Sequence, residues 1–403
     1  MLTFEEARRK VIDQVGKMRG PRACASVSVW DALGLVLAQE VKTDREYPPF
    51  DRSTRDGYAV RSKDVKPGAP LKCAGEIKAG DTVTEALAAG TCVQIMTGAA
   101  VPPGADAVVM IEYTEREGEL VRFERGAQLG QNIVPRGSEA RAGQTVLKPG
   151  VRLGFAELAL AAQVGATPLQ CSKRSRVAIL STGDEVVLIE GQPGAFQIRN
   201  SNSVSLAAQV RIAGGEPVVL GNAADRVGDL GEKIERGLQE DALVLTGGVS
   251  MGKYDLVESV LKALGAEFFF DAVAIRPGKP AVFAICQGKP VFGLPGNPVS
   301  TMVTFQLFVT PAIDLLSGAE AHPLPLVEAR LMEALNERPG LTHFLPARIA
   351  WHGAEPQVSA LKWQGSGDIA ALAGANGFLV VPAEREKIAS GERVSVLLRK
   401  DVV

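Results

Sequence analysis

Residues 177–185 read VAILSTGDE, and this stretch decides the fold of the middle of the chain. Four consecutive aliphatic residues without polar alternation are typical of a strand that is buried on both faces of a parallel sheet. A loop and the helical run SNSVSLAAQVRIAG (201–214) follow, then the strand PVVLG (217–221) and a helix over about 226–239. Strands that alternate with helices predict an open, mostly parallel sheet with helices on both faces.

The same alternation continues toward the C-terminus. We expect a strand at ALVLTGG (242–248), a helix over about 255–264 and two further strands at AVFAI (281–285) and PVFGLPG (290–296). A long apolar helix begins at Pro298, and Pro311 should kink or end it. Ligands of such sheets bind beyond the carboxyl ends of the strands, so the loops that follow the strands are the place to look for chemistry.

The regions that flank the α/β part have a different pattern of apolar, glycine and proline residues. From about 48 to 146, short apolar runs are cut by glycine and proline, which predicts a β-rich or barrel-like unit. The first residues form a charged amphipathic helix with Thr3 and Glu6 spaced as a capping box. Residues 138–172 contain one more helix, and we expect them to rejoin the N-terminal helix. The end of the chain returns to short strands.

These patterns predict a multi-domain α/β protein. The expected parts are an elongated domain in two pieces, an inserted β-rich domain, an α/β domain with a doubly wound sheet, and a C-terminal β-barrel-like domain. Their predicted limits in chain order are 1–44 (elongated), 45–137 (inserted), 138–172 (elongated), 173–322 (α/β) and 323–403 (C-terminal).

Composition narrows the class of protein. Of the 403 residues, 46% are hydrophobic and 22% charged, and the formal net charge is −2. A nucleic-acid binder usually carries a basic excess, so we expect no nucleic-acid partner. No stretch approaches the ~18 apolar residues of a membrane span, and the N-terminus lacks the apolar segment of a signal peptide. Five cysteines without CxxC spacing indicate reduced, mostly buried thiols and a cytoplasmic location.

The distribution of histidine restricts the chemistry of the central region. All three histidines, His322, His343 and His352, lie in the last quarter of the chain. A zinc site or a Ser-His triad in the α/β domain is therefore disfavoured. A hard ion such as Mg²⁺, held by carboxylates and phosphate oxygens, stays open.

Four loops of the α/β region carry polar groups suited to an anion. Asp184 and Glu185 follow the first strand, and Arg276-Pro277-Gly278-Lys279 places two cations beside a turn. The other two loops are glycine- or proline-rich and enter helices: 246–255, with Gly247, Gly248, Ser250 and Asp255, and 295–300, with Pro295, Asn297, Pro298 and Ser300. Glycine lets backbone N–H groups approach an anion. Together the loops predict a phosphate-binding mouth with acidic groups able to hold a metal.

Each loop taken alone has a plainer interpretation. A glycine loop between strand and helix is more often only a connection, and Asp184-Glu185 would serve equally well as a solvated pair. The β-rich unit has three further polar stretches, 48–60, 95–99 and 135–139, which on physics alone are turns. The coincidence of four loops at one edge favours a site, although it does not identify the substrate.

The same stretches, taken in order, resemble those of molybdopterin molybdenumtransferases and of the gephyrin E domain. The resemblance rests on seven motifs and covers essentially the whole chain. The motifs are PPFDRSTRDGYAV (48–60), QIMTGAAVPPGADAVVMIE (94–112), GQNIVPRGSE (130–139), STGDE (181–185), TGGVSMGKYD (246–255), RPGKP (276–280) and LPGNPVS (294–300). PARIAW (346–351) and QGSGDIAALAGANGFLVVP (364–382) look like the last β domain of that family.

The resemblance implies an activity and an assembly. It implies insertion of molybdenum from molybdate into adenylyl-molybdopterin, with Mg²⁺-dependent cleavage of the phosphoanhydride and release of AMP. It also implies a homodimer whose cleft lies between the α/β domain of one subunit and the inserted domain of the other. Molybdopterin adenylyltransferase and the acceptor molybdoenzymes would be further partners.

The matching motifs carry over residue roles. Glu185, Asp255, Asp56 and Thr97 are the implied catalytic residues, the last two reaching in from the partner's inserted domain. Glu185, Asp225 and Asp255 are the implied metal ligands. The implied substrate-binding residues are Gly247, Gly248, Ser250, Arg276, Lys279, Pro295, Asn297, Pro298, Ser300, Arg348 and Ser366. Two positions depart from the family pattern: Glu139 stands where aspartate is usual, and Arg276 where lysine is frequent, which changes the geometry of the donors.

Three rival interpretations stay open. A molybdopterin adenylyltransferase shares the α/β scaffold, but its GGTG loop with a following Arg-Asp differs from GGVSMGKYD, and it lacks the extra β domains. A non-catalytic scaffold would be favoured by loss of Asp56 or Glu185, and both are present. A generic phosphate-binding oligomer is what is left if the resemblance misleads.

Overall fold

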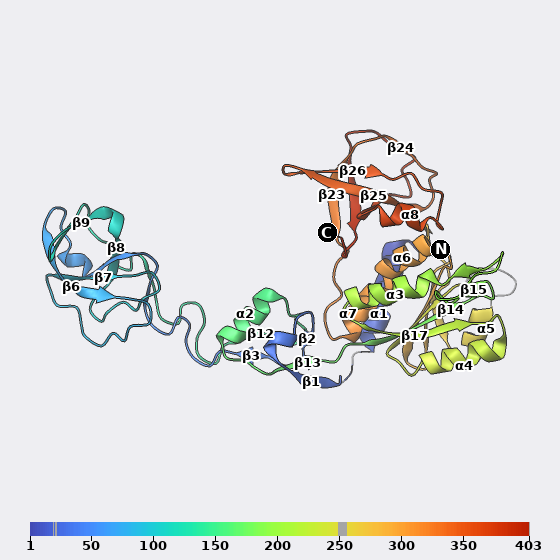
Figure 1. Ribbon diagram of the computed structural model, residues 1–403, viewed down its shortest axis with the longest axis horizontal. Coiled ribbons are helices and arrows are strands. Elements are labelled where there is room, and N and C mark those ends of the chain that lie inside the picture. The colour runs from blue at the N-terminus through green and yellow to red at the C-terminus, as the bar shows by residue number, and fades with distance from the viewer. Residues whose placement is uncertain (19, 21, 249–255, 403) are drawn as a thin grey trace.

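The computed structural model describes residues 1–18, 20, 22–248 and 256–402. The molecule is elongated, with the inserted β-rich part at one end and the α/β sheet with the C-terminal β structure at the other (Figure 1). A slender middle section, built from residues on both sides of the insertion, joins the two ends. All five cysteines are free, and only Cys24 is exposed.

The central sheet has six strands in the order β17-β14-β18-β22-β21-β19. Four are parallel: β17 (Glu216–Ala223), β14 (Arg176–Thr182), β18 (Ala242–Thr246) and β22 (Lys289–Leu294). The remaining two, β21 (Val282–Cys286) and β19 (Glu267–Phe270), are antiparallel to their neighbours. The predicted mostly parallel sheet is confirmed. The sequence analysis missed β19, and a tight turn at 287–288 makes β21 run against β22.

Helices cover both faces of this sheet because successive strand residues point to opposite sides. Val177 and Ile179 pack with α1 (Phe4–Lys17), with α3 (Ser201–Ile212) and with the long apolar helix that begins at Pro298. Ala178 and Leu180 pack with α4 (Val227–Gly237) and α5 (Leu256–Ala263). Helix α1 begins with the predicted capping box, in which Thr3 and Glu6 bond each other's backbone N–H groups.

The long apolar helix does not end at Pro311. It continues through α6 (Pro298–Thr304), the π-helical turn η4 (Phe305–Val309) and α7 (Thr310–Leu316). Proline lacks an N–H and crowds the carbonyl four residues earlier, and the wider π turn just before α7 accommodates both effects. The 19 residues from Pro298 to Leu316 are long and apolar enough to cross a membrane, contrary to our expectation, but 78% of their apolar window is buried inside the protein. We therefore regard the segment as a core helix.

The middle section pairs strands from before and after the insertion. Its three-stranded sheet has the order β1 (Cys24–Val27), β13 (Leu169–Ser172), β2 (Val36–Leu37). Nearby lie β3 (Val41–Lys42) with β12 (Thr145–Leu147), the turn η1 (Val29–Asp31) and helix α2 (Phe155–Gln163). Residues 138–172 were expected to rejoin the N-terminal helix. They pair instead with the strands after it, because the apolar face of α1 is buried against the α/β domain.

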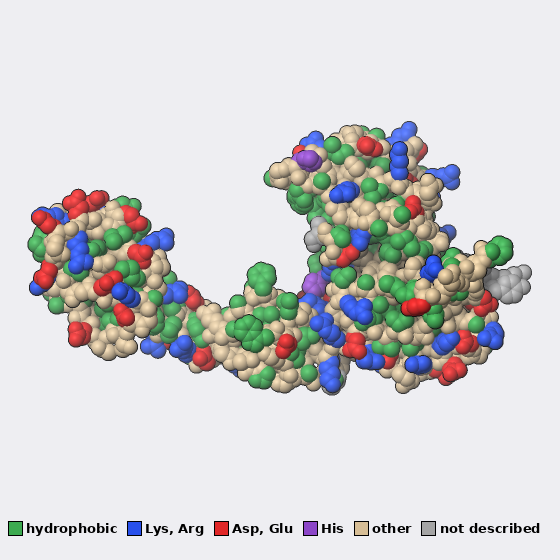
Figure 2. All heavy atoms as spheres, in the orientation of Figure 1, with side chains coloured by type: hydrophobic (Ala, Val, Ile, Leu, Met, Phe, Trp, Pro, Cys, Tyr) green, Lys and Arg blue, Asp and Glu red, His purple; other side chains and the backbone are tan. Residues whose placement is uncertain are grey.

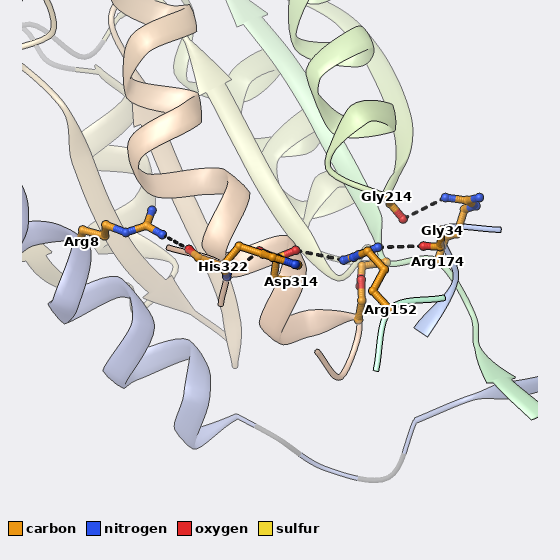
Figure 3. Close-up of polar contacts among 9 residues, drawn as sticks. Arg8, Gly34, Arg152, Arg174, Gly214, Asp314 and His322 are labelled. Carbon is orange, nitrogen blue, oxygen red and sulfur yellow. Dashed lines mark hydrogen bonds and ion pairs between the residues drawn. The ribbon is translucent and has the colours of Figure 1, made fainter. Parts of the chain in front are cut away.

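Asp314 of α7 anchors the middle section to the α/β domain (Figure 3). Its side chain is 4% exposed, and its Oδ1 lies 2.9 Å from Nη2 of Arg152, whose Nη1 donates to the carbonyl of Gly34. His322 Nδ1 lies 3.0 Å from the other carboxylate oxygen. Arg8 of α1 donates to the carbonyl of His322 at 2.5 Å. We call Arg152, Asp314 and His322 the joint.

The inserted part is a six-stranded sheet with hydrophobic clusters on its two faces. The order is β8 (Ala107–Met110), β5 (Gly57–Val60), β7 (Thr91–Ile95), β6 (Pro70–Ile77), β10 (Leu120–Phe123) and β9 (Thr114–Glu117). The turns η2 (Ser62–Asp64) and η3 (Ile111–Tyr113) connect these strands, and β4 (Arg52–Ser53) pairs with β11 (Ile133–Val134).

The C-terminal part is a closed barrel of five strands. The strands β25 (Thr342–His352), β26 (Glu355–Ala360), β23 (Leu326–Leu331), β29 (Arg393–Leu398) and β27 (Gly377–Val381) follow one another, and β27 pairs back onto β25. Strand β20 (Ile275–Arg276), from the α/β region, pairs with β25 and ties the barrel to the sheet. The remaining elements are α8 (Ile369–Ala373) and the ribbons β15 (Val186–Val187) with β16 (Ile198–Arg199) and β24 (Leu335–Asn336) with β28 (Lys387–Ile388).

Candidate active site

The loops that the sequence analysis singled out meet at one edge of the central sheet. Strands β14, β18 and β22 are parallel and in register, with Ser181 opposite Thr246 and Thr246 opposite Leu294. The loops after these strands therefore leave the sheet side by side. Two adjoining cavities open at this edge and share Pro280, Pro295, Asn297 and Gly367 in their walls.

The first cavity, here called the strand-edge cavity, has a volume of about 630 Å³. Six of the predicted site residues line it: Glu185, Gly247, Gly248, Pro295, Asn297 and Pro298. Most of its polar lining residues come from the end of β14, the start of α3 and the end of β18. This volume suits a small organic ligand.

Gly247 and Gly248 bring the backbone close to the end of β14. Both have positive φ values, +88° and +63°. A Cβ on Gly247 would lie 2.6 Å from the carbonyl oxygen of Thr182, and one on Gly248 would lie 2.7 Å from the Thr182 hydroxyl. Only glycine fits here without displacing the strand. Ser250 and Asp255, predicted to follow in this loop, lie outside the described residues.

Two polar atoms in the wall of the strand-edge cavity lack a hydrogen-bond partner among the residues that the structure describes. The Thr182 hydroxyl is buried and unbonded, and so is the Oδ1 atom of Asn202. The Nδ2 of Asn202 is fully used, donating to Thr246 Oγ1 at 2.9 Å and to the carbonyl of Gly296 at 2.8 Å. Buried polar atoms are normally paired, so these two mark positions that a bound ligand would satisfy.

Three carboxylates gather at the rim of this cavity. The backbone N–H of Asp225 donates to Asp184 Oδ1 at 3.2 Å, and Glu185 is close enough to act on Asp225 electrostatically. Burial, and then the negative charges of Asp184 and Glu185, raise the pKa of Asp225. A cation bound beside these carboxylates would relieve the repulsion among them.

A complete metal cage is not present among the described residues. They contain no group of three or more His, Cys, Asp or Glu side chains arranged to hold a metal. Of the predicted ligands, Glu185 and Asp225 come together, whereas Asp255 falls outside the described ranges. Mg²⁺ commonly binds through one or two carboxylates, with substrate phosphates and water filling the other positions. The exposed acidic pair fits that mode of binding.

The second cavity, here called the barrel-facing cavity, lies between the sheet edge and the barrel and has a volume of about 860 Å³. Its lining includes six predicted residues: Arg276, Lys279, Pro295, Asn297, Ser300 and Ser366. Asn297 Nδ2 donates to Ser366 Oγ at 2.8 Å, and the N–H of Val299 donates to the Ser366 carbonyl at 2.9 Å. These bonds join the start of α6 to the barrel. Cations, amides and hydroxyls together suit an oxyanion.

Arg348 is the predicted substrate-binding residue that the structure does not bring to either cavity. It lies on β25 opposite Ser359, and its side chain is exposed. His343, on the same strand, does line the barrel-facing cavity, as does Glu337. The sequence analysis missed both of these, and it also missed Asn202. A polar residue in the first turn of α3 and a lone histidine in an apolar strand were the available signals.

Asp56 and Thr97 lie together in the inserted part. One carboxylate oxygen of Asp56 accepts bonds from the Thr97 backbone N–H at 2.6 Å and from its hydroxyl at 2.9 Å. These two bonds, the backbone one first, lower the pKa of Asp56. Asp56 is therefore a carboxylate at neutral pH. Glu139, which departs from the family pattern, pairs with Arg52 at 2.9 Å.

Comparisons with known proteins cover almost the whole chain. Residues 2–165 match the MoeA N-terminal region (domains I and II), residues 178–315 a probable molybdopterin-binding domain, and residues 328–398 the MoeA C-terminal region (domain IV). A molybdopterin molybdenumtransferase of Nostoc sp. is 34% identical over 416 residues, spanning 98% of this chain and 94% of that protein. The chain belongs to the MoeA family.

Other members of the MoeA family agree with this assignment. The molybdopterin molybdenumtransferase of Bacillus subtilis is 33% identical and is matched over 93% of this chain and 90% of its own length. The crystal structure of a molybdopterin biosynthesis MoeA protein from Pyrococcus horikoshii is 32% identical, with a TM-score of 0.74 over 97% of this chain and 98% of that one. The chain is accordingly a transferase of molybdenum cofactor biosynthesis, as the motifs implied.

Proposed function

We propose that this MoeA-family chain inserts molybdenum from molybdate into adenylyl-molybdopterin, with Mg²⁺-dependent cleavage of the phosphoanhydride and release of AMP. The observation that carries the proposal is the pair of adjoining cavities. One is lined by Gly247 and Gly248, by two polar atoms without a partner among the described residues, and by Glu185, and the other has two cations and hydroxyls. A phosphate-bearing pterin nucleotide matches the first cavity, and a tetrahedral dianion such as molybdate matches the second.

The residues of the strand-edge cavity would orient the nucleotide and its phosphates. Gly247 and Gly248 hold the loop after β18 against Thr182 at the end of β14, where a larger side chain would not fit. The Thr182 hydroxyl can donate and Asn202 Oδ1 can accept, so the two would fix a ligand that carries both kinds of group. When bound, Mg²⁺ would neutralise the charge that develops on the phosphate oxygens. Glu185 and Asp225 would hold it, and its binding would relieve the repulsion that raises the pKa of Asp225.

The residues of the barrel-facing cavity would hold the oxyanion. Arg276 and Lys279 supply charge, and Ser300 and Ser366 supply hydroxyl donors. Arginine in place of the lysine frequent in the family keeps the positive charge and adds a planar, two-pronged donor. Arg348 stays a prediction, since its side chain reaches neither cavity in one subunit.

We also propose that the active unit is a homodimer in the cytoplasm. Asp56 and Thr97 lie in the inserted part, at the opposite end of the molecule from both cavities (Figure 1). Only a second copy could bring them to this edge of the sheet. Figure 2 shows hydrophobic side chains on the surface of the middle section, where Trp30 is 90% and Phe155 88% exposed. Exposed aromatic side chains of this kind suit a protein interface.

The direct test is to supply adenylyl-molybdopterin, molybdate and Mg²⁺, and to measure AMP release and formation of active cofactor. We expect both products, and both should depend on molybdate. An adenylyltransferase would instead make the nucleotide from molybdopterin and ATP, and a scaffold would do neither. AMP release without active cofactor would contradict insertion.

A further inference from the structure

The barrel-facing cavity is larger than an oxyanion needs. Its volume is about 860 Å³. A five-atom anion such as molybdate occupies on the order of 100 Å³, a few times the ~30 Å³ share of one water molecule. Cavities of several hundred Å³ are typical of sites for organic ligands. An oxyanion held by Arg276 and Lys279 therefore fills only part of this cavity, and the larger part is left for an organic group.

Trp363 is a large aromatic side chain in the wall of this cavity that the motifs did not single out. It is partly buried, whereas Ile275 and Leu345 in the same lining are at most 5% exposed. Trp363 packs against two hydrophobic clusters, the one on the α1 face of the central sheet and the one inside the barrel. Its indole ring is thus supported by two domains and still contributes surface to the cavity.

The loop between β26 and α8 holds Trp363 in place. Asp368 accepts a bond from the backbone N–H of Gln364 at 3.0 Å, and its other carboxylate oxygen caps the first turn of α8. Ser366, between them, accepts the bond from Asn297 at the start of α6. These contacts fix the loop to its own helix and to the sheet edge. A ring on a fixed loop loses little conformational entropy when it binds a ligand.

The chemistry of the proposed substrate decides which of its parts belongs beside Trp363. In adenylyl-molybdopterin the dithiolene carbons lie between the flat pterin and the carbon that carries the phosphates, and the adenosine lies beyond the phosphates. Molybdenum has to reach the dithiolene from an oxyanion held by Arg276 and Lys279. With the phosphates in the strand-edge cavity, the dithiolene lies near the wall that the two cavities share. The pterin then extends into the barrel-facing cavity, and the adenosine does not.

We propose that the barrel-facing cavity binds the pterin ring of the substrate beside the oxyanion, and that the indole of Trp363 packs against the face of that ring. This inference rests on the proposed function, because it takes the substrate and the position of its phosphates from there. Loss of a stacking contact between an aromatic side chain and a heterocyclic base weakens binding by about tenfold or more. Trp363 binds and orients the pterin and takes no part in the bond changes.

The test compares Trp363→Leu with Trp363→Phe in the full chain. Leucine keeps an apolar side chain between the two clusters but has no ring, whereas phenylalanine keeps a flat face. Affinity for adenylyl-molybdopterin is measured by calorimetry without molybdate, so that the substrate is not consumed. Trp363→Leu should bind it about tenfold more weakly than the wild type, and Trp363→Phe within about threefold of the wild type.

Three controls separate stacking from a general disturbance of the site. Affinities for AMP and for molybdate should be unchanged in Trp363→Leu, because the strand-edge cavity and the two cations are intact. Trp351→Leu removes a tryptophan of β25 that is 57% exposed and lines neither cavity, and it should bind adenylyl-molybdopterin as the wild type does.

The small number of tryptophans allows a direct spectroscopic measurement. The chain has three, Trp30, Trp351 and Trp363, so protein labelled with fluorotryptophan gives one ¹⁹F signal for each, and Trp363→Phe assigns the third. Adenylyl-molybdopterin should shift the Trp363 signal through the ring current of the pterin, and AMP should leave it in place.

Two outcomes would overturn the proposal. One is a Trp363→Leu protein that binds adenylyl-molybdopterin as tightly as the wild type. The other is a loss of AMP affinity as large as the loss of substrate affinity, because the ring beside Trp363 would then be the adenine. A wild-type protein that neither binds nor converts adenylyl-molybdopterin would instead contradict the proposed function, and this inference with it.

Discussion

The two ends of the molecule prepare their polar groups in opposite ways. In the inserted part, the Asp56 carboxylate is already bonded to Thr97 by two short contacts, and its pKa is lowered. At the edge of the central sheet, the Thr182 hydroxyl and Asn202 Oδ1 have no partner within the described part of the chain, and the pKa of Asp225 is raised. The inserted part holds a carboxylate that is already hydrogen-bonded, whereas the sheet edge has two polar atoms that no other described residue satisfies.

This difference teaches how an elongated chain can divide one site between two places. A carboxylate that is already hydrogen-bonded within its own domain can join a site as part of a rigid unit, because it needs no further partner there. An unsatisfied cavity has to be completed on arrival of its ligand. The division makes sense if the inserted part of one subunit serves the cavities of another.

The largest effect on the rate of molybdenum insertion should come from mutating one site residue at each end of the molecule. Asp56→Asn and Glu185→Gln should each lower the rate of molybdenum insertion by about a thousandfold, since each removes a charged group from the site. Co-expression of the two variants should restore activity, because a mixed dimer has one cleft free of both changes. With random pairing, about a quarter of the wild-type activity is expected, measured as active cofactor formed.

Two changes on the same side give the matched control for this experiment. Co-expressed Glu185→Gln and Lys279→Ala leave every cleft of a mixed dimer with one lesion, so no recovery is expected. If the first pair also fails to recover while mixed dimers are demonstrably formed, Asp56 does not act across subunits.

The next largest effect concerns the joint, which ties the middle section to the α/β domain. Arg152→Ala would leave Asp314, 3% exposed, without its closest cation. We expect a loss of about 3 kcal/mol or more in the free energy of unfolding, measured in urea. Arg174→Ala removes only an exposed 3.3 Å bond to Gly214, and should cost under about 1 kcal/mol. Equal losses in the two variants would show that the joint is not a special support.

The hydroxyl of Thr182 allows a prediction in which stability and ligand affinity change in opposite directions. Thr182→Val removes a buried polar atom that has no partner among the described residues, so the free energy of unfolding should rise by about 1 kcal/mol while ligand affinity falls. Thr43→Val is the control: its hydroxyl is equally buried at 4%, but donates to the Arg141 carbonyl at 2.6 Å. That variant should be less stable by about 1 kcal/mol, and its affinity should not change. A destabilised Thr182→Val protein would mean that the hydroxyl is satisfied in solution.

The smallest expected effect is a shift in pH dependence. Because hydrogen bonds from Thr97 lower the pKa of Asp56, the carboxylate persists below the pH at which an ordinary aspartate takes up a proton. Its favourable contribution is present above the ordinary aspartate pKa and is lost as the pH falls through the lowered value. Thr97→Val keeps the backbone bond and removes the hydroxyl bond. The pKa of Asp56, followed by NMR, should rise in that variant, and an unchanged value would contradict this account.

Local chemistry explains which parts of the fold could be predicted. The aliphatic run at 177–180 and the capping box at Thr3 and Glu6 specify their elements through neighbouring residues alone, and both elements form as expected. The partner of the N-terminal helix could not be predicted in this way. An amphipathic face requires burial but does not specify the surface that buries it, and α1 packs on the α/β domain and not on residues 138–172.

The candidate site likewise has features that could be predicted from local sequence and features that could not. The loops after parallel strands could be grouped from sequence because strand direction alone brings their ends to one edge. The contact of Glu337 with His343 could not be foreseen, because it depends on how the barrel closes and on β20 pairing with β25. The predicted domain limits stay proposals.

The sequence by itself determined the alternation of strands and helices in the α/β region, the family and the set of polar loops, because these depend on local patterns and motifs. Only the tertiary structure decided which polar atoms are left unbonded, which carboxylates repel one another, and that Asp56 lies at the opposite end of the molecule from the cavities. Those properties depend on distances between residues far apart in the chain, and such distances arise only when the separate parts pack together.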